Sequence, residues 1–131
     1  LSRGLGDVYK RQILTDQFTR NVFRRTPRSF SGDMLALRTC LHCLCSFDVS
    51  QQKKERSHFI LIPLMHSENL KFQEMSMPLF QMHTSEKVYQ YALKHKNIIA
   101  RFGRFPHRNV ILGRTSTKSE IQFLKSPGSS F

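Results

Sequence analysis

Histidine and glutamate residues in two short stretches of this sequence have side chains that could do acid–base chemistry. His66 and Glu68 lie two positions apart, and His107 follows further along the chain. Imidazole is the side chain whose ordinary pKa lies closest to neutral pH, so a general acid and a general base could be supplied here for hydrolysis or proton transfer. His66, Glu68 and His107 are therefore the candidate catalytic residues.

A second set of polar residues could bind a ligand. Arginine has a planar guanidinium that suits two-point recognition of a carboxylate or a phosphate. If these side chains converge in the fold, the set predicts a site for a small anionic molecule. Its members are Asp16, Arg20, Asn21, Arg28, Arg104, Arg108 and Arg114.

The same residues allow a purely structural interpretation. Polar groups under packed loops need hydrogen-bond partners, so these side chains could form a buried ion-pair network that holds loops to helix ends. Such networks also shift pKa values without any catalytic role. The sequence leaves both interpretations open, and whether the protein is an enzyme stays undecided.

Metal and cofactor sites are not predicted. Cys40, Cys43 and Cys45 follow a spacing of three and then two, which cannot place all three thiols on one face of a helix. The sequence has no glycine-rich phosphate loop, no paired Cys-x-x-Cys motifs and no nucleophile elbow. An odd number of clustered cysteines fits a reducing compartment, so a cytoplasmic location is expected.

The net charge of +12 raises the question of a polyanionic partner. The basic residues are dispersed and lack the aromatic-basic pattern of an RNA-recognition sheet, so nucleic acid is the least favoured partner. A non-catalytic protein-interaction scaffold is the main alternative to an anion site. The longest apolar run, Phe59 to Met65, is too short for a bilayer and contains Pro63, so no membrane association is expected.

Helical periodicity recurs along the chain. Leu14, Phe18 and Val22 lie on one face of a first helix, with Asp16 and Arg20 on another. A second helix is expected after a Ser31 cap. Its apolar stripe would be Met34, Leu37, Leu41, Leu44 and Cys45.

Three further helices are expected in the second half of the chain. One begins at Ser67 and should kink or break at Pro78. The next begins after Thr84 or Ser85 and ends at Gly103. The last follows a capping box over residues 117–120. Periodicity alone does not decide whether residues 59–65 form a strand or a helix.

Residues 1–12, with the sequence LSRGLGDVYKRQ, contain no initiator methionine and resemble a translated library-adaptor sequence. We expect this segment to be a non-native leader, with an ordinary flexible N-terminal tail as the alternative. On the leader interpretation the natural N-terminus has been lost.

Four motifs carry a family resemblance, and Leu112-Gly113-Arg114 and Ser126-Pro127-Gly128 also fit it. The motifs are Asp16-Gln17-Phe18-Thr19-Arg20-Asn21, Thr26-Pro27-Arg28, Pro63-Leu64-Met65-His66-Ser67-Glu68 and Arg101-Phe102-Gly103-Arg104-Phe105-Pro106-His107-Arg108-Asn109. Residues 13–131 resemble the C-terminal part of a domain of the domain-of-unknown-function 924 family, whose biochemical role is not established. The resemblance implies an all-α fold of five or six antiparallel helices packed as in tetratricopeptide-like arrays, with residues 59–65 helical. The sequence departs from the family pattern at Thr19 and at Pro78.

Overall fold

A computed structural model describes residues 2–131, and no β-strand is present in that range. A first helical rod runs without interruption from α1 (Ser2–Gln12) through a π-helical segment, η1 (Ile13–Phe18), into α2 (Thr19–Val22). With this rod taken as one helix, the described chain has six helices. The prediction of an all-α fold with five or six helices is confirmed.

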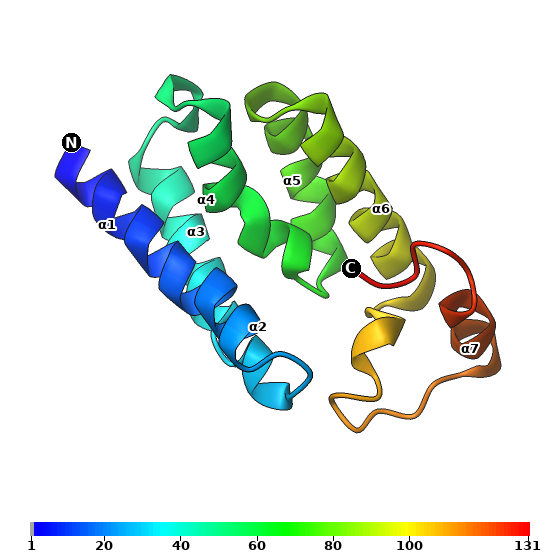
Figure 1. Cartoon of the computed structure of the whole chain (residues 1–131). Helices are drawn as coiled ribbons and strands as arrows, with labels where there is room; N and C mark the ends of the chain where they lie inside the picture. Colours follow the sequence, from blue (N-terminus) through cyan, green and yellow to red (C-terminus); the bar gives the residue numbers. More distant parts are fainter. Residues whose placement is uncertain (1) are drawn as a thin grey trace.

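The other helices pack in the order in which they follow along the chain. Short links join α3 to α4, α4 to α5 and α5 to α6, and each of these pairs is in contact, which gives antiparallel neighbours. Figure 1 shows them side by side, with the first rod on one side and α7 beyond the end of α6. The elements are η2 (Pro27–Phe30), α3 (Asp33–Ser46), η3 (Val49–Gln51), α4 (Lys54–His66), α5 (Leu70–His83), α6 (Glu86–Phe102), η4 (Pro106–Arg108) and α7 (Lys118–Leu124).

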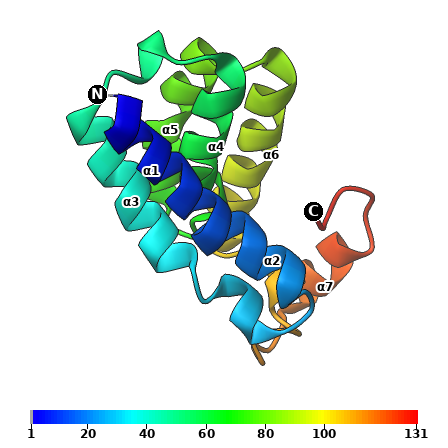
Figure 2. The same cartoon turned by 60° about the vertical axis from the view of Figure 1, so that its left-hand side comes forward.

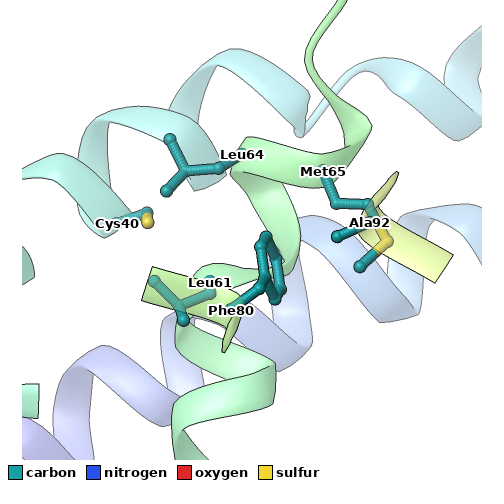
Figure 3. Close-up of a cluster of buried hydrophobic side chains, with 6 residues drawn as sticks. All are labelled: Cys40, Leu61, Leu64, Met65, Phe80 and Ala92. Atoms are coloured by element: carbon teal, nitrogen blue, oxygen red, sulfur yellow. The ribbon is translucent and has the colours of Figure 1, made fainter. Parts of the chain in front are cut away.

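Helix α4 lies at the centre of the molecule. It contacts the first rod, α3, α5 and α6, and every residue from 60 to 65 is buried. A helix surrounded by neighbours is apolar on all sides, which is why periodicity could not tell it from a strand. The main core cluster, shown in Figure 3, joins side chains of four helices: Cys40, Leu61, Leu64, Met65, Phe80 and Ala92.

The expected start and apolar stripe of α3 were partly wrong. Gly32 is the N-cap, while the Ser31 hydroxyl donates to the carbonyl of Arg28. The fully buried line runs one residue away from the expected stripe, so Met34 and Cys45 are exposed. The buried residues of α3 are Ala36, Thr39, Cys40 and Cys43, with Leu37, Leu41 and Leu44 packed against the core from the side.

The expected break in α5 does not occur. The helix is continuous across Pro78 and begins after Asn69, whose side-chain oxygen accepts from the backbone N–H of Lys71. Pro78 and Glu74 are both exposed, so water can bond the Glu74 carbonyl that proline leaves without an N–H partner. The helix can therefore tolerate this proline at its outer surface.

The expected ends of α6 and α7 are confirmed. The Ser85 hydroxyl accepts from the N–H of Val88, and Gly103 ends α6 with a left-handed φ of 72°. Thr117 and Glu120 form a reciprocal capping box at the start of α7.

From Gln12 onward, the first rod is turned so that its polar face points inward. Leu14, Phe18 and Val22 are 58%, 53% and 55% exposed, whereas Asp16 is only 2% exposed. Figure 2 shows the rod lying across α3 and α4. Its buried carboxylate reaches the candidate site, so the rod is a positioning element as well as a cover.

The proposed leader, residues 1–12, overlaps α1, and only its first residue lies outside the described range. In that segment Gln12 is buried and its side-chain amide lies 3.3 Å from the carbonyl oxygen of Ile60. The leader interpretation stays a prediction.

Among the described helices, none combines the length and the apolar character that crossing a membrane requires.

Candidate functional site: a basic pocket beside a buried carboxylate

Asp16 lies at the centre of one polar cluster. Its Oδ1 accepts from Arg20 Nε at 3.0 Å and lies 2.9 Å from His66 Nδ1, while Oδ2 accepts from the Gln17 amide at 2.6 Å. Arg20 also donates to Asp33 on α3 at 2.8 Å. The first rod, α3 and the end of α4 are thereby joined through hydrogen bonds between polar side chains.

The protonation states of this cluster follow from its surroundings. Burial alone would raise the pKa of Asp16, but the hydrogen bond from His66 and the charge of Arg20 bring it to about 2. Burial lowers the pKa of His66 and, together with the charges of Arg20 and Arg108, outweighs the hydrogen bond and the charge of Asp16, which raise it. An ionised carboxylate can only accept, so the neutral imidazole of His66 carries its proton on Nδ1 and leaves Nε2 as the acceptor.

Two other predicted residues, Arg114 and Glu68, form a separate ion pair. Arg114 donates to both Glu68 oxygens, at 2.8 and 3.0 Å, and also to Asn109 and the Phe105 carbonyl. Burial raises the pKa of Glu68, but the hydrogen bonds from Arg114 and the Phe105 N–H outweigh it and lower that pKa. This pair fastens the loop after α6 to the link between α4 and α5.

Arg104 behaves in the same way at the end of α6. It donates to Glu120 Oε1 at 2.8 Å and Oε2 at 3.0 Å, and to the Thr115 carbonyl. Glu120 also accepts from Asn109 and from the N–H of Thr117. Arg104 therefore ties α7 to the rest of the fold, as the structural interpretation of these motifs anticipates.

Arg108 is the most buried arginine of the predicted set, at 6% exposed. Its guanidinium lies between the rings of Phe30 and Phe105, 4.7 and 4.6 Å from their centroids, and donates to the His66 carbonyl at 2.9 Å. Burial and the charge of Arg20 lower the pKa of Arg108 to about 10, which leaves it charged at neutral pH. Its Nε is buried without a hydrogen-bond partner in the described chain.

A pocket of about 950 Å³ opens beside these groups. Its lining includes five lysine or arginine side chains and no aspartate or glutamate. The floor is apolar, with Ile62, Met65 and Val88 among its residues. The basic residues of the lining are Arg20, Arg24, Arg25, Lys87 and Arg108, together with His58, His66, His95 and His107.

Two more histidines of the lining are held neutral. Burial is the main cause that lowers the pKa of His95 to about 3 and that of His107 to about 4, and neighbouring cationic groups add to both effects. His95 Nδ1 lies 2.7 Å from the Tyr91 carbonyl, and the Phe131 ring packs against the His95 ring at 3.8 Å. His107 Nδ1 is buried and has no partner within the described chain.

The pocket gathers half of the predicted site residues. Those that line it are Arg20, Asn21, His66, His107 and Arg108. Asp16 lies directly behind His66. The remaining four lie outside the lining: Glu68, Arg104 and Arg114 in the two ion pairs, and Arg28 stacked 4.4 Å above the Phe23 ring.

Sequence reasoning missed several lining residues. Arg24 and Arg25 follow Phe23, the C-cap of α2, and were not among the predicted site residues. The sequence nevertheless places them in a Pro27-containing loop whose arginines could form a surface site. Lys87, Tyr91 and His95 share one face of α6, where only charge and spacing could have marked them. Nothing in a linear pattern shows that this face meets the loop after α2.

Comparisons with known proteins place this geometry in a family. The family model described as a bacterial protein of unknown function (DUF924) matches residues 8–128, a range that includes residues 8–12 of the proposed leader. A solved structure of the protein of unknown function ATU0120 from Agrobacterium tumefaciens is similar, with a TM-score of 0.88 and 32% sequence identity. The similarity covers 94% of this chain and 69% of that one. A search of curated proteins gives no significant match. The chain thus belongs to the DUF924 family of bacterial proteins of unknown function.

Proposed function

We propose that this protein binds a small anionic molecule in the basic pocket. The observation that carries the proposal is the charge of the lining, which has five cationic side chains and no carboxylate. Cationic side chains around an apolar-floored cavity are a favourable environment for a carboxylate or a phosphate. The volume of about 950 Å³ lies within the range of small-molecule and cofactor sites.

The cations of the pocket are only partly neutralised by the protein itself. Asp16 and Asp33 pair with Arg20, and Asp33 also lies 3.6 Å from Arg108. Arg24, Arg25 and Lys87 make no ion pair with any group in the described part of the chain. An anionic ligand would supply the missing countercharge, and these three exposed side chains would meet it at the rim.

The apolar floor adds a condition on the ligand. Ile62 and Met65 are 9% and 5% exposed and Val88 is half-buried, so these residues form an apolar part of the lining against which an apolar ligand body would pack. We therefore propose an organic anion with an apolar part, bound head-first against the arginines. Longer aliphatic dicarboxylates should bind more tightly than short ones.

The test compares two lysines at equivalent helix positions. Lys87 is the second residue of α6 and lines the pocket, whereas Lys71 is the second residue of α5 and does not. Lys87→Glu should weaken binding of succinate, adipate and inorganic phosphate by about tenfold, or about 1.4 kcal/mol, by isothermal titration calorimetry. Lys71→Glu changes the same charge at the same kind of position and should leave binding unchanged.

The proposal would be contradicted if no anion binds, or if neither Lys87→Glu nor Lys71→Glu changes the binding. Thermal unfolding gives an independent readout, because a ligand at a hundredfold excess over its Kd adds about 2.7 kcal/mol to the stability of the folded state. The nucleic-acid alternative predicts affinity for short RNA that falls steeply with salt. The scaffold alternative predicts no shift with any anion.

A cytoplasmic location stays part of the proposal. Cys40 and Cys43 are buried and Cys45 is exposed, and all three are free thiols. Burial raises the pKa of Cys40 and of Cys43, so both are inert thiols of the core. This cysteine chemistry suits a reducing compartment.

A further inference from the structure

We propose that His66 is a general base in this pocket and that the protein hydrolyses a carboxylic ester that carries a separate anionic group. This inference rests on the proposed anion site, because the arginines would hold the anionic group while His66 activates water. Geometry singles out His66 among the four histidines of the lining. The ester class follows from the chemistry of a neutral imidazole beside guanidinium groups.

His66 has the arrangement that a general base needs. Its Nδ1 donates to the buried Asp16 carboxylate at 2.9 Å, which fixes both the tautomer and the ring orientation. Its other nitrogen, Nε2, makes no hydrogen bond with any group in the described chain. Because His66 lines the pocket, Nε2 is the ring nitrogen left for a water molecule or a ligand.

The other three histidines lack this arrangement. His95 is anchored by a carbonyl instead of a carboxylate, and the Phe131 ring covers it. His107 has a buried Nδ1 without a partner, and His58 stacks on Phe59 without a carboxylate anchor. A carboxylate also stabilises the imidazolium that forms when the base takes a proton, which a carbonyl does less well.

Arg108 lies where it can assist the reaction. It donates to the backbone carbonyl of His66 at 2.9 Å, so its charge lies next to the base. A guanidinium in a partly dry pocket stabilises the negative charge that develops on an ester carbonyl oxygen. The same charge helps to keep His66 neutral, with its lone pair available.

The reaction balances without an added reagent. A water molecule gives a proton to His66 Nε2 as its oxygen bonds to the ester carbonyl carbon, and the carbonyl π electrons move onto its oxygen. The tetrahedral intermediate then collapses, the bond to the alkoxy oxygen breaks, and that oxygen takes the proton from His66. The products are a carboxylic acid and an alcohol, and the imidazole returns to its neutral state.

The experiment uses mono-4-nitrophenyl esters of succinic, glutaric and adipic acid as probes. The whole chain should release 4-nitrophenol from at least one of them, and His66→Gln should lower kcat by roughly 100-fold or more. Adipate binding by the same variant separates loss of catalysis from loss of the site, because a glutamine still carries the backbone carbonyl that holds Arg108. His42→Gln changes an exposed histidine outside the pocket and is the matched control.

Asp16→Asn tests the positioning residue. An asparagine amide can donate to Nδ1, which moves the ring proton to Nε2 and removes the base. Long-range proton–nitrogen NMR should show Nδ1–H in the wild type and Nε2–H in the variant, with kcat reduced to a similar extent as in His66→Gln. If Asp16 had only a structural role, Asp16→Asn would lower stability without changing the tautomer of His66.

The pH profile gives a third readout. The wild-type rate should rise with pH as His66 loses its proton, with a midpoint below 6.5, since the pKa of His66 is lowered from its ordinary value. The charged and titratable groups around it are Asp16, Arg20, Asp33, His58, His95 and Arg108.

Two results would overturn the inference. One is adipate binding with no hydrolysis of any of the three esters, which would leave the anion site intact. The other is hydrolysis at the same rate in the wild type and in His66→Gln. In the first case, hydrolysis of 4-nitrophenyl phosphate would identify a phosphate ester as the substrate in place of a carboxylic ester. If the wild type does not bind adipate, that result would instead contradict the proposed function on which the inference rests.

Discussion

Arg25 has a left-handed backbone, with a φ of 66°, although it is not glycine. It lies in the turn after α2 that also places Arg24 beside the pocket. This conformation costs a residue with a Cβ on the order of 1 kcal/mol or more. The side chain of this strained residue lines the basic pocket, where its charge would contribute to anion binding.

Two substitutions at Arg25 should separate strain from charge. Arg25→Gly should raise the free energy of unfolding by about 1 kcal/mol, because glycine adopts a positive φ without a steric penalty. It should also weaken adipate binding. Arg25→Ala should weaken binding to the same extent without a gain in stability, since alanine keeps the Cβ. Urea unfolding and calorimetry measure the two effects, and equal stabilities of the two variants would contradict the strain argument.

At the scale of elements, the close approach of the first rod to the start of α3 depends on Gly32. A Cβ on this residue would lie 1.8 Å from the carbonyl oxygen of Thr15, which is a backbone atom and cannot rotate away. The approach brings Arg20 of the rod to Asp33 of α3. The geometry of the Asp16 cluster thus depends on Gly32 having no side chain.

Gly32→Ala should therefore destabilise the fold by roughly 1–3 kcal/mol through overpacking. Gly6→Ala is the matched control, because a Cβ at Gly6 inside α1 meets no atom within 4 Å. Alanine is the better helix former, so the control should be stabilised by about 0.5–1 kcal/mol. Thermal and urea unfolding would check both, and a neutral Gly32→Ala would show that the rod can shift freely.

At the scale of the whole molecule, buried neutral histidines make stability depend on pH. Burial chiefly lowers the pKa of His95 to about 3 and of His107 to about 4, and that of His66 also falls. The unfolded chain binds protons at these residues below pH 6.5, whereas the folded chain does not. Stability from these groups is therefore complete above pH 6.5 and falls as the pH drops towards the lowered pKa values.

The free energy of unfolding should be lower at pH 5 than at pH 7.5. The Asp16 carboxylate does not account for this change, because its contribution is lost only below pH 3.8, as the pH falls towards its pKa of about 2. His95→Gln should flatten the dependence, whereas the exposed His42→Gln should not. Urea titrations at the two pH values measure the difference, and equal stabilities for the wild type would refute the account.

Local sequence signals determined the elements of this protein. Ser85, Gly103 and the box from Thr117 to Glu120 set helix ends through hydrogen bonds within a few residues, so the sequence contains what is needed to find them. The family motifs predicted the all-α fold. They also predicted that residues 59–65 are helical, which periodicity alone could not distinguish from a strand. Five of the ten residues predicted for a site line the pocket, and all five lie in the family motifs.

Tertiary structure decided which face of each helix is inside and which cations share a cavity. An apolar stripe is formed by Leu14, Phe18 and Val22, yet these side chains are exposed. The opposite face is buried, because Asp16 on that face contacts His66, fifty positions away in the chain. The sequence did not distinguish Arg104 and Arg114 from Arg108. In the structure, Arg104 pairs with Glu120 and Arg114 with Glu68, so neither lines the pocket. Packing and charge pairing act between residues distant in the chain, so a linear pattern cannot show which partners meet.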